Sequence, residues 1–146
     1  ILGARILSKK VIDCFPGGIF NFHRGLLPEN RGLDTIKWAI FNNIPQGITT
    51  HLIDENIDVG MKVYKESIEV DRQDTIFDVD SKLFYLEMKH LHTILNDEFK
   101  IPEPKSLKSS YKSQKAVPDD IDNKVYEDFD LYKKNYSEIL KKFNLD

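Results

Sequence analysis

The chain has 146 residues, of which 40% are hydrophobic and 31% are charged, and its formal net charge is −3. This composition is typical of one globular domain and argues against a disordered or fibrous protein. The acidic balance offers no basic patch for nucleic acid or an anionic membrane surface. No apolar run reaches the roughly 18 residues that a membrane-spanning helix needs.

The N-terminal residues and the cysteine content indicate a cytoplasmic location. Cys14 is the single cysteine of the chain, which excludes an internal disulfide and fits a reducing compartment. Residues 1–7 lack the charged start and cleavage site of a signal peptide, and they predict a buried strand instead. Such a strand needs neighbours on both sides. We therefore expect either that part of the domain precedes Ile1 or that a partner, such as a second copy, completes the sheet.

Strands and helices are expected to alternate through the first half of the chain. Ser8 is a plausible start for a short helix, and β-branched and aromatic residues predict a strand over 18–23. A helix is expected from Leu33 to Asn43, and strands over 47–54 and 61–70. This alternation favours an α/β fold with a mostly parallel sheet.

A long helix is expected after Thr75. Thr75 and Asp78 have the spacing of a capping box, with Asp in place of the usual Glu. Apolar residues at helical spacing then continue to about Phe99. We expect this helix to close a catalytic region of residues 1–100. His90 and His92 on the helix are expected at the surface.

Residues 101–146 are predicted to form a separate loop and helical extension. The Lys- and Ser-rich stretch 105–115 reads as an exposed loop. The acidic residues of 119–130 are expected on a solvated face. A final helix is expected from Phe129 to Phe143, where aromatic and aliphatic residues recur on one side.

The candidate reactive groups are Asn21, His23 and Asp58. Asn21 and His23 are two residues apart on a predicted strand, so their side chains point to the same side. Reactive groups in open α/β sheets gather in loops beyond strand ends. Asp58 lies in such a loop, and a carboxylate near His23 would hold a positive imidazolium.

These three groups suit the attack of an amine on an acyl carbon, which creates a tetrahedral oxyanion. The Asn21 amide and a protonated His23 could donate to that oxyanion, and Asp58 could hold the histidine and take the amine proton. No Ser or Cys nucleophile is required. A lone histidine at a strand end is more often a structural residue held by hydrogen bonds, and spacing alone does not separate these two interpretations. His51 is expected either to face packed side chains or to support Asp58.

Two motifs resemble the signatures of the formyltetrahydrofolate-dependent formyltransferases. Residues 19–32 read Ile-Phe-Asn-Phe-His-Arg-Gly-Leu-Leu-Pro-Glu-Asn-Arg-Gly, like the family's Asn-x-His followed by a Leu-Leu-Pro loop and Gly. The second motif runs from Gly47 to Asp54 and continues as Ile57-Asp58-Val59-Gly60. The resemblance covers roughly residues 1–95. It implies the Rossmann-like formyltransferase fold, of which this chain is the catalytic C-terminal half followed by helices.

The resemblance also implies residue roles. Asn21, His23 and Asp58 take the catalytic positions, with 10-formyltetrahydrofolate as the formyl donor and no metal. The residues implied in folate binding are Arg5, Ile6, Leu7, Asp54, Glu55, Ile57 and Asp58. Arg24 is a departure, because the family often has Pro after the catalytic histidine. The glycine-rich loop that the family carries near the start of the domain does not occur in the chain.

The resemblance favours a small phosphorylated amine as the acceptor. Residues 5–8 and 32–35 look closest to the glycinamide ribonucleotide branch, and Glu87 falls near its amine-contacting Glu. This branch implies one-carbon metabolism and purine biosynthesis. Phe84 departs from it, and Arg31-Gly32 with Trp38 resembles the methionyl-tRNA and sugar branches. The alternatives are a nucleotide-aminosugar or methionyl-tRNA formyltransferase, a formyltetrahydrofolate hydrolase, or an inactive half-domain that needs a partner.

Overall fold

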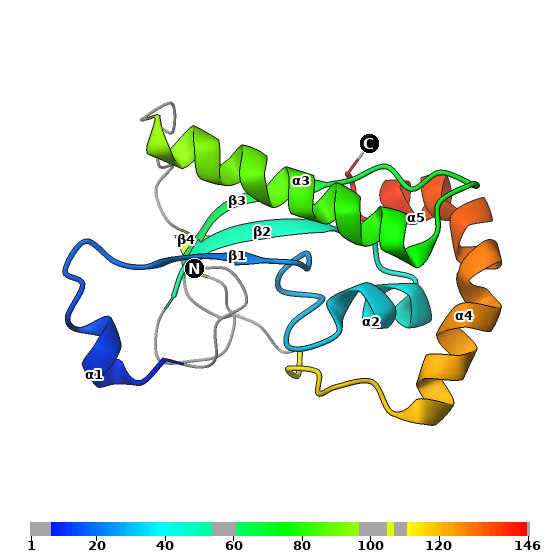
Figure 1. Ribbon diagram of the computed structural model, residues 1–146, viewed down its shortest axis with the longest axis horizontal. Helices are drawn as coiled ribbons and strands as arrows, with labels where there is room; N and C mark the ends of the chain where they lie inside the picture. Colours follow the sequence, from blue (N-terminus) through cyan, green and yellow to red (C-terminus); the bar gives the residue numbers. More distant parts are fainter. Residues whose placement is uncertain (1–6, 54–60, 97–104, 107–110, 146) are drawn as a thin grey trace.

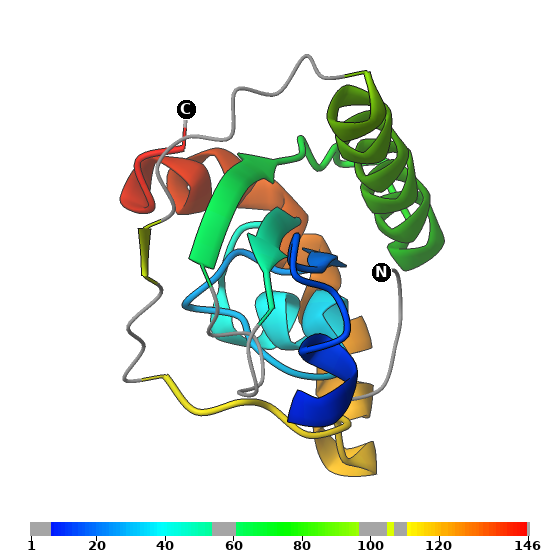
Figure 2. The ribbon, with the colours of Figure 1, turned by 90° about the vertical axis from the view of Figure 1, so that its left-hand side faces the viewer.

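The structure is a computed structural model that describes residues 7–53, 61–96, 105–106 and 111–145. Its sheet has four strands in the order β1 (Phe20–His23), β2 (Gly47–Leu52), β3 (Met61–Ser67) and β4 (Lys105–Ser106). Helices α1 (Lys9–Ile12), α2 (Thr35–Asn42), α3 (Ile76–Leu95), α4 (Asp119–Lys134) and α5 (Tyr136–Lys142) complete the described elements. In Figure 1, α3 runs above the sheet, α2 lies below it, and α4 stands at its end; Figure 2 shows the same layers along the strands.

The α/β class is confirmed, but the strand direction differs from the expected one. All three described strand pairs are antiparallel, where the alternation of strands and helices predicted a mostly parallel sheet. A parallel pair needs a connection that crosses from one end of the sheet to the other. The connection from β1 to β2, which contains the eight-residue α2, instead starts and ends at the same end of the sheet, so β2 runs opposite to β1.

Helix α3 begins as the sequence predicts. The Thr75 hydroxyl accepts a hydrogen bond from the Asp78 backbone N–H, and the Asp78 carboxylate accepts one from the Thr75 backbone N–H. This reciprocal capping box satisfies backbone donors that the first turn would otherwise leave unpaired. One face of the helix buries Val79, Leu83 and Leu86 against the sheet. Among the described helices, none is both long enough and apolar enough to cross a membrane.

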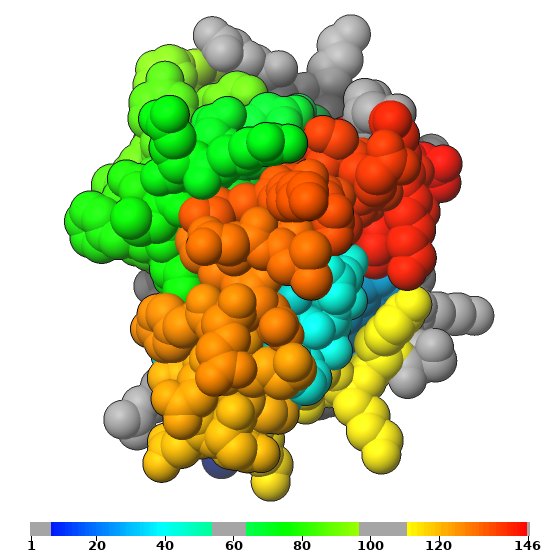
Figure 3. All heavy atoms as spheres, turned by 90° about the vertical axis from the view of Figure 1, so that its right-hand side faces the viewer, coloured from blue at the N-terminus to red at the C-terminus, as the bar shows by residue number. Residues whose placement is uncertain are grey.

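The C-terminal region contains two helices where one was predicted. The acidic stretch from Asp119 forms the first turns of α4, and Asp119, Asp120 and Asp130 are exposed, in agreement with the predicted solvated face. Carboxylates are favourable there, because the helix dipole is positive at its N-terminus. Asn135 separates α4 from α5. Figure 3 shows α4 covering this end of the molecule, between α3 and the 111–118 segment.

Both C-terminal helices share one hydrophobic core with the sheet. The cluster joins residues of α2, β2 and α3 to apolar residues of α4 and α5. Two buried tyrosines add polar contacts: the Tyr132 hydroxyl donates to Ile44 O at 2.7 Å, and the Tyr136 hydroxyl accepts from Gln46 N at 2.9 Å. Whether residue 100 is a domain boundary stays a prediction.

Candidate functional site

Asn21, His23 and His51 lie together on one face of the sheet. Asn21 pairs with His51 in the β1–β2 register, and Asn21 Nδ2 lies 3.1 Å from His51 Nε2. The rings of His23 and His51 meet edge to face, with centroids 6.5 Å apart. The strand periodicity therefore placed Asn21 and His23 correctly on one face. The sequence did not decide whether His51 faces packed side chains or supports Asp58. In the structure the His51 ring is buried and lies beside Asn21 and His23.

A backbone carbonyl fixes the tautomer of His23. His23 Nε2 lies 2.8 Å from Asn30 O, and a carbonyl oxygen can only accept, so Nε2 carries the hydrogen. The loop closes tightly here, since a Cβ at Gly25 would lie 2.5 Å from Asn30 O. Thr49 Oγ1 donates to Gly25 O at 2.8 Å and holds the same loop from β2. The imidazole of His23 thus has a defined orientation.

The 111–117 segment holds the far side of this loop. Gln114 N donates to Arg31 O at 2.8 Å, and Leu33 N donates to Gln114 O at 3.1 Å. Further along, Val117 N donates to the Asp34 carboxylate at 2.9 Å. Residues from the predicted C-terminal extension therefore brace the loop that orients His23.

Arg24, at the position where the family often has Pro, forms two ion pairs with α3. Its Nη1 lies 2.5 Å from Asp80 Oδ1, and its Nη2 lies 2.7 Å from Glu87 Oε2. The hydrogen bond with Glu87 contributes most to raising the pKa of Arg24, against the lowering effect of burial. The predicted acceptor contact, Glu87, is 3% exposed and is held by this guanidinium. Sequence reasoning noted Arg24 as a departure but had no signal for its partners.

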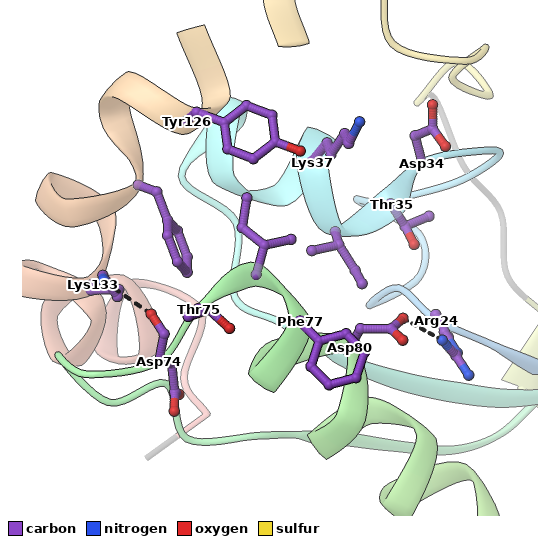
Figure 4. A pocket seen from close by; sticks show the side chains of 13 residues that line it. Arg24, Asp34, Thr35, Lys37, Asp74, Thr75, Phe77, Asp80, Tyr126 and Lys133 are labelled. Atoms are coloured by element: carbon purple, nitrogen blue, oxygen red, sulfur yellow. Dashed lines mark hydrogen bonds and ion pairs between the residues drawn. The ribbon is translucent and has the colours of Figure 1, made fainter. Parts of the chain in front are cut away.

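An open pocket of about 780 Å³ lies beside the Arg24–Asp80 pair. Figure 4 shows that it is bounded by the start of α2, the first turns of α3 and the side chains of α4. Phe77 and Tyr126 stand at its rim, with exposed fractions of 74% and 60%. Its volume is within the range of small-molecule sites.

The prediction that His90 lies at the surface is wrong. His90 is 2% exposed, with Nδ1 at 2.9 Å from Thr50 Oγ1 and Nε2 at 3.3 Å from Glu66 Oε2. Burial lowers its pKa, and the hydrogen bond with Glu66 opposes that effect. The helical spacing could have predicted this burial, because His90 lies four residues after the buried Leu86 and so on the same face of the helix. His92 is exposed, as predicted.

Most of the predicted folate-binding residues lie outside the described part of the chain. Leu7 is described and is partly buried just before α1. Asp58, the third residue of the predicted catalytic trio, lies outside the described residues. So do the predicted folate-binding residues Arg5, Ile6, Asp54, Glu55 and Ile57. Within the described ranges, no three His, Cys, Asp or Glu side chains gather as metal ligands would.

Comparison with known sequences finds one family. The model of a family described as formyl transferase matches residues 4–95. Methionyl-tRNA formyltransferase from Halothermothrix orenii is 35% identical over 122 residues, which cover 83% of this chain and 38% of that protein. Phosphoribosylglycinamide formyltransferase from Bacillus subtilis is 29% identical over 92 residues, covering 62% of this chain and 47% of that protein. The chain thus spans less than half the length of both relatives.

A solved structure shares the arrangement of the described elements. It is that of WlaRD, a sugar 3N-formyl transferase, in the presence of dTDP and 5-N-formyl-THF. The two chains are 29% identical with a TM-score of 0.56, and the match covers 80% of this chain and 44% of that one. The three similar proteins differ in the amine that their names specify.

Proposed function

Since the chain has the formyltransferase fold and belongs to the formyl transferase family, we propose that it transfers a formyl group from 10-formyltetrahydrofolate to a primary amine. The observation that carries this proposal is the placement of the Asn21 amide and the His23 imidazole on one face of β1. In the matched family region, these two residues occupy the Asn-x-His motif.

The hydrogen-bond donors of Asn21 and His23, on one face of β1, suit a reacting carbonyl group. The formyl donor supplies an activated formyl carbon whose oxygen gains negative charge as the amine attacks. The bond between this carbon and N10 of the folate then breaks, and N10 leaves as an amine that takes up the proton lost by the attacking amine. The Asn21 amide N–H stabilises that charge by donating a hydrogen bond, and a protonated His23 does the same. Asp58 holds the positive imidazolium and takes the proton of the amine, directly or through a water. Arg5, Ile6, Leu7 and the loop from Asp54 to Asp58 are the residues we propose to hold the folate.

Glycinamide ribonucleotide is the first acceptor to test, since the resemblance favours a small phosphorylated amine. The B. subtilis relative is named as a phosphoribosylglycinamide formyltransferase, which supports this choice. The similar sugar transferase supports an aminosugar nucleotide as the second acceptor. Methionyl-tRNA is the third, from the name of the H. orenii protein. The proposal places the reaction in one-carbon metabolism, and its first acceptor places it in purine biosynthesis.

The test is an assay of the chain with 10-formyltetrahydrofolate and each of these three amines. We expect formyl transfer to one of them. Asp58→Ala should lower the rate by roughly two orders of magnitude or more, as expected for a lost acid–base group. Asp13→Ala is the matched control, because Asp13 is an exposed carboxylate paired with Lys9 on α1.

Two results would contradict the proposal. Near-normal turnover of the Asp58→Ala variant would show that Asp58 does not take part in the reaction. Release of free formate without transfer to any amine would favour formyltetrahydrofolate hydrolysis. If the chain shows neither reaction, adding the rest of a homologous domain as a separate polypeptide tests whether it is a half-domain that needs a partner.

A further inference from the structure

A row of three residues crosses the sheet beneath the loop that follows β1. In the strand register, His23 of β1 lies opposite Thr49 of β2, and Thr49 lies opposite Lys65 of β3. Residues directly opposite each other on neighbouring strands project to the same face of the sheet. The loop folds back over this row, because Thr49 and Lys65 each bind one part of it.

Thr49 binds the first part of the loop through both functions of its hydroxyl. Its Oγ1 donates to Gly25 O at 2.8 Å and accepts from Leu27 N at 2.9 Å. Thr49 is fully buried, so the loop cannot exchange these contacts for water without moving away from β2. The hydroxyl therefore sets the distance between β2 and the residues that follow His23.

Lys65 binds the second part of the loop through an ion pair. Its Nζ lies 3.0 Å from Glu29 Oε2, and the two side chains are only 15% and 22% exposed. Solvent and salt weaken such a partly buried pair less than an exposed one. Glu29 directly precedes Asn30, so the pair holds the chain one residue from the carbonyl that binds His23 Nε2.

The side chain of Asn30 fixes that carbonyl from the other direction. Asn30 is 2% exposed, and its Nδ2 donates at 2.8 Å to Thr35 O, at the start of α2. Its backbone N–H donates to Leu26 O at 2.9 Å. With the carbonyl held in this way, His23 keeps its hydrogen on Nε2. The proton that His23 gains and loses in the proposed reaction is then carried by Nδ1.

We propose that Thr49, Lys65 and the side chain of Asn30 are positioning residues for His23. They act through the loop, and none of them contacts the reacting atoms. Lys65 acts from two strands away. The kinetic consequence rests on the proposed formyl transfer, because it requires that His23 takes part in the reaction. The tautomer of His23 is a property of the folded chain, so it can be tested without any turnover.

The tautomer is measured by nitrogen NMR of the chain with isotope-labelled histidines, of which it has four, and His23→Gln identifies the signals of His23. We expect the neutral ring of the wild type to carry its hydrogen on Nε2, and Lys65→Met and Asn30→Leu each to populate the Nδ1–H form. Lys124→Met and Asn42→Leu are the controls, because they replace an exposed lysine paired on α4 and an exposed amide of α2. An Nδ1–H ring in the wild type, or an unchanged tautomer in both test variants, would overturn the proposal.

Steady-state kinetics test the consequence for the reaction. Lys65→Met should lower kcat for formyl transfer by about tenfold with little change in either KM, because a misplaced imidazole slows the chemical step. Lys65→Glu places two carboxylates side by side and should be at least as slow. Combining it with Glu29→Lys restores an ion pair in the reverse direction and should recover part of the loss. A double variant as slow as Lys65→Glu alone would overturn the role of the pair.

Failure of this inference is distinguishable from failure of the proposed reaction. Circular dichroism identifies a temperature at which all the variants are folded, and the comparisons are made there. If the chain transfers formyl groups, a normal kcat in both Lys65→Met and Asn30→Leu would overturn the positioning role and leave the reaction standing. A chain that transfers no formyl group but has the expected tautomers would support the positioning role and contradict the proposed reaction alone.

Discussion

The backbones of Gly32 and Gln114 form a parallel β-bridge that ties the loop after β1 to the 111–117 segment. Gly32 has a φ of +97°, and a Cβ there would lie 2.1 Å from Gln114 O. The segment cannot move away without losing its hydrogen bonds to Arg31 and Leu33. The bridge therefore requires glycine at position 32 for both conformation and space.

Gly32→Ala should destabilise the protein by about 2 kcal/mol or more, because it combines backbone strain with a backbone clash. Urea unfolding followed by circular dichroism measures the change. Gly17→Ala is the control, since a Cβ at Gly17 meets nothing within 4 Å. Equal stabilities of the two variants would show that the bridge is not required in solution.

Tyr136→Phe should cost about 1–3 kcal/mol, the penalty for leaving a buried polar group unpaired. The hydroxyl accepts from Gln46 N and donates to Ile68 O at 2.9 Å, and the residue is 2% exposed. The change appears as a lower urea midpoint at unchanged slope. Tyr85→Phe removes an exposed hydroxyl of α3 and should be neutral, so a comparable loss there would contradict this account.

His90 should make stability fall as the solution is acidified. Burial lowers the pKa of His90 below its ordinary value of 6.5 in the folded protein. Between 6.5 and that lower value, the unfolded chain binds a proton that the folded protein does not, so the free energy of unfolding decreases with falling pH. The nearby Glu66 adds its own change at lower pH, because hydrogen bonds from Lys89, Tyr64 and His90 together outweigh burial and lower its pKa.

The measurement is the free energy of unfolding between about pH 7.5 and pH 5.5, where Glu66 stays ionised. His90→Gln should flatten this dependence, while His92→Gln on the exposed side of α3 should leave it as in the wild type. Parallel pH profiles for His90→Gln and the wild type would exclude His90 as the cause.

His51 is expected to position Asn21. Phe in place of His51 keeps a ring but removes the nitrogen that lies 3.1 Å from the Asn21 amide. We expect kcat for formyl transfer to fall by about tenfold or more with little change in either KM, because misplacement of a reacting group lowers the rate of the chemical step. His51→Gln, which places an amide near the Nε2 position, should recover part of the loss. A rise in KM at constant kcat would indicate a binding role instead.

Local patterns in the sequence predicted the local features well. The capping box at Thr75 and the shared face of Asn21 and His23 each depend on residues two or three positions apart. The formyl transferase family could be identified because its two motifs lie in the part of the chain that the family model matches.

Contacts between distant segments could not be predicted in this way. The ion pairs of Arg24 depend on where α3 crosses the end of β1, and no local pattern specifies that crossing. The antiparallel direction of β2 depends on the path of the connection that contains α2, and α2 packs against α4 from the far end of the chain. His90 is polar but lies on the buried face of α3, where it finds hydrogen-bond partners on β2 and β3 that no local pattern in the sequence predicts.

The central strand β2 is paired along both edges, and it is buried without interruption from Gly47 to His51. Each of its paired amide hydrogens is bonded to one neighbouring strand and can exchange with solvent only when that pairing opens. We therefore expect slow exchange along β2, the strand that carries His51. The imidazole beside Asn21 is thus held by a strand that is paired on both sides.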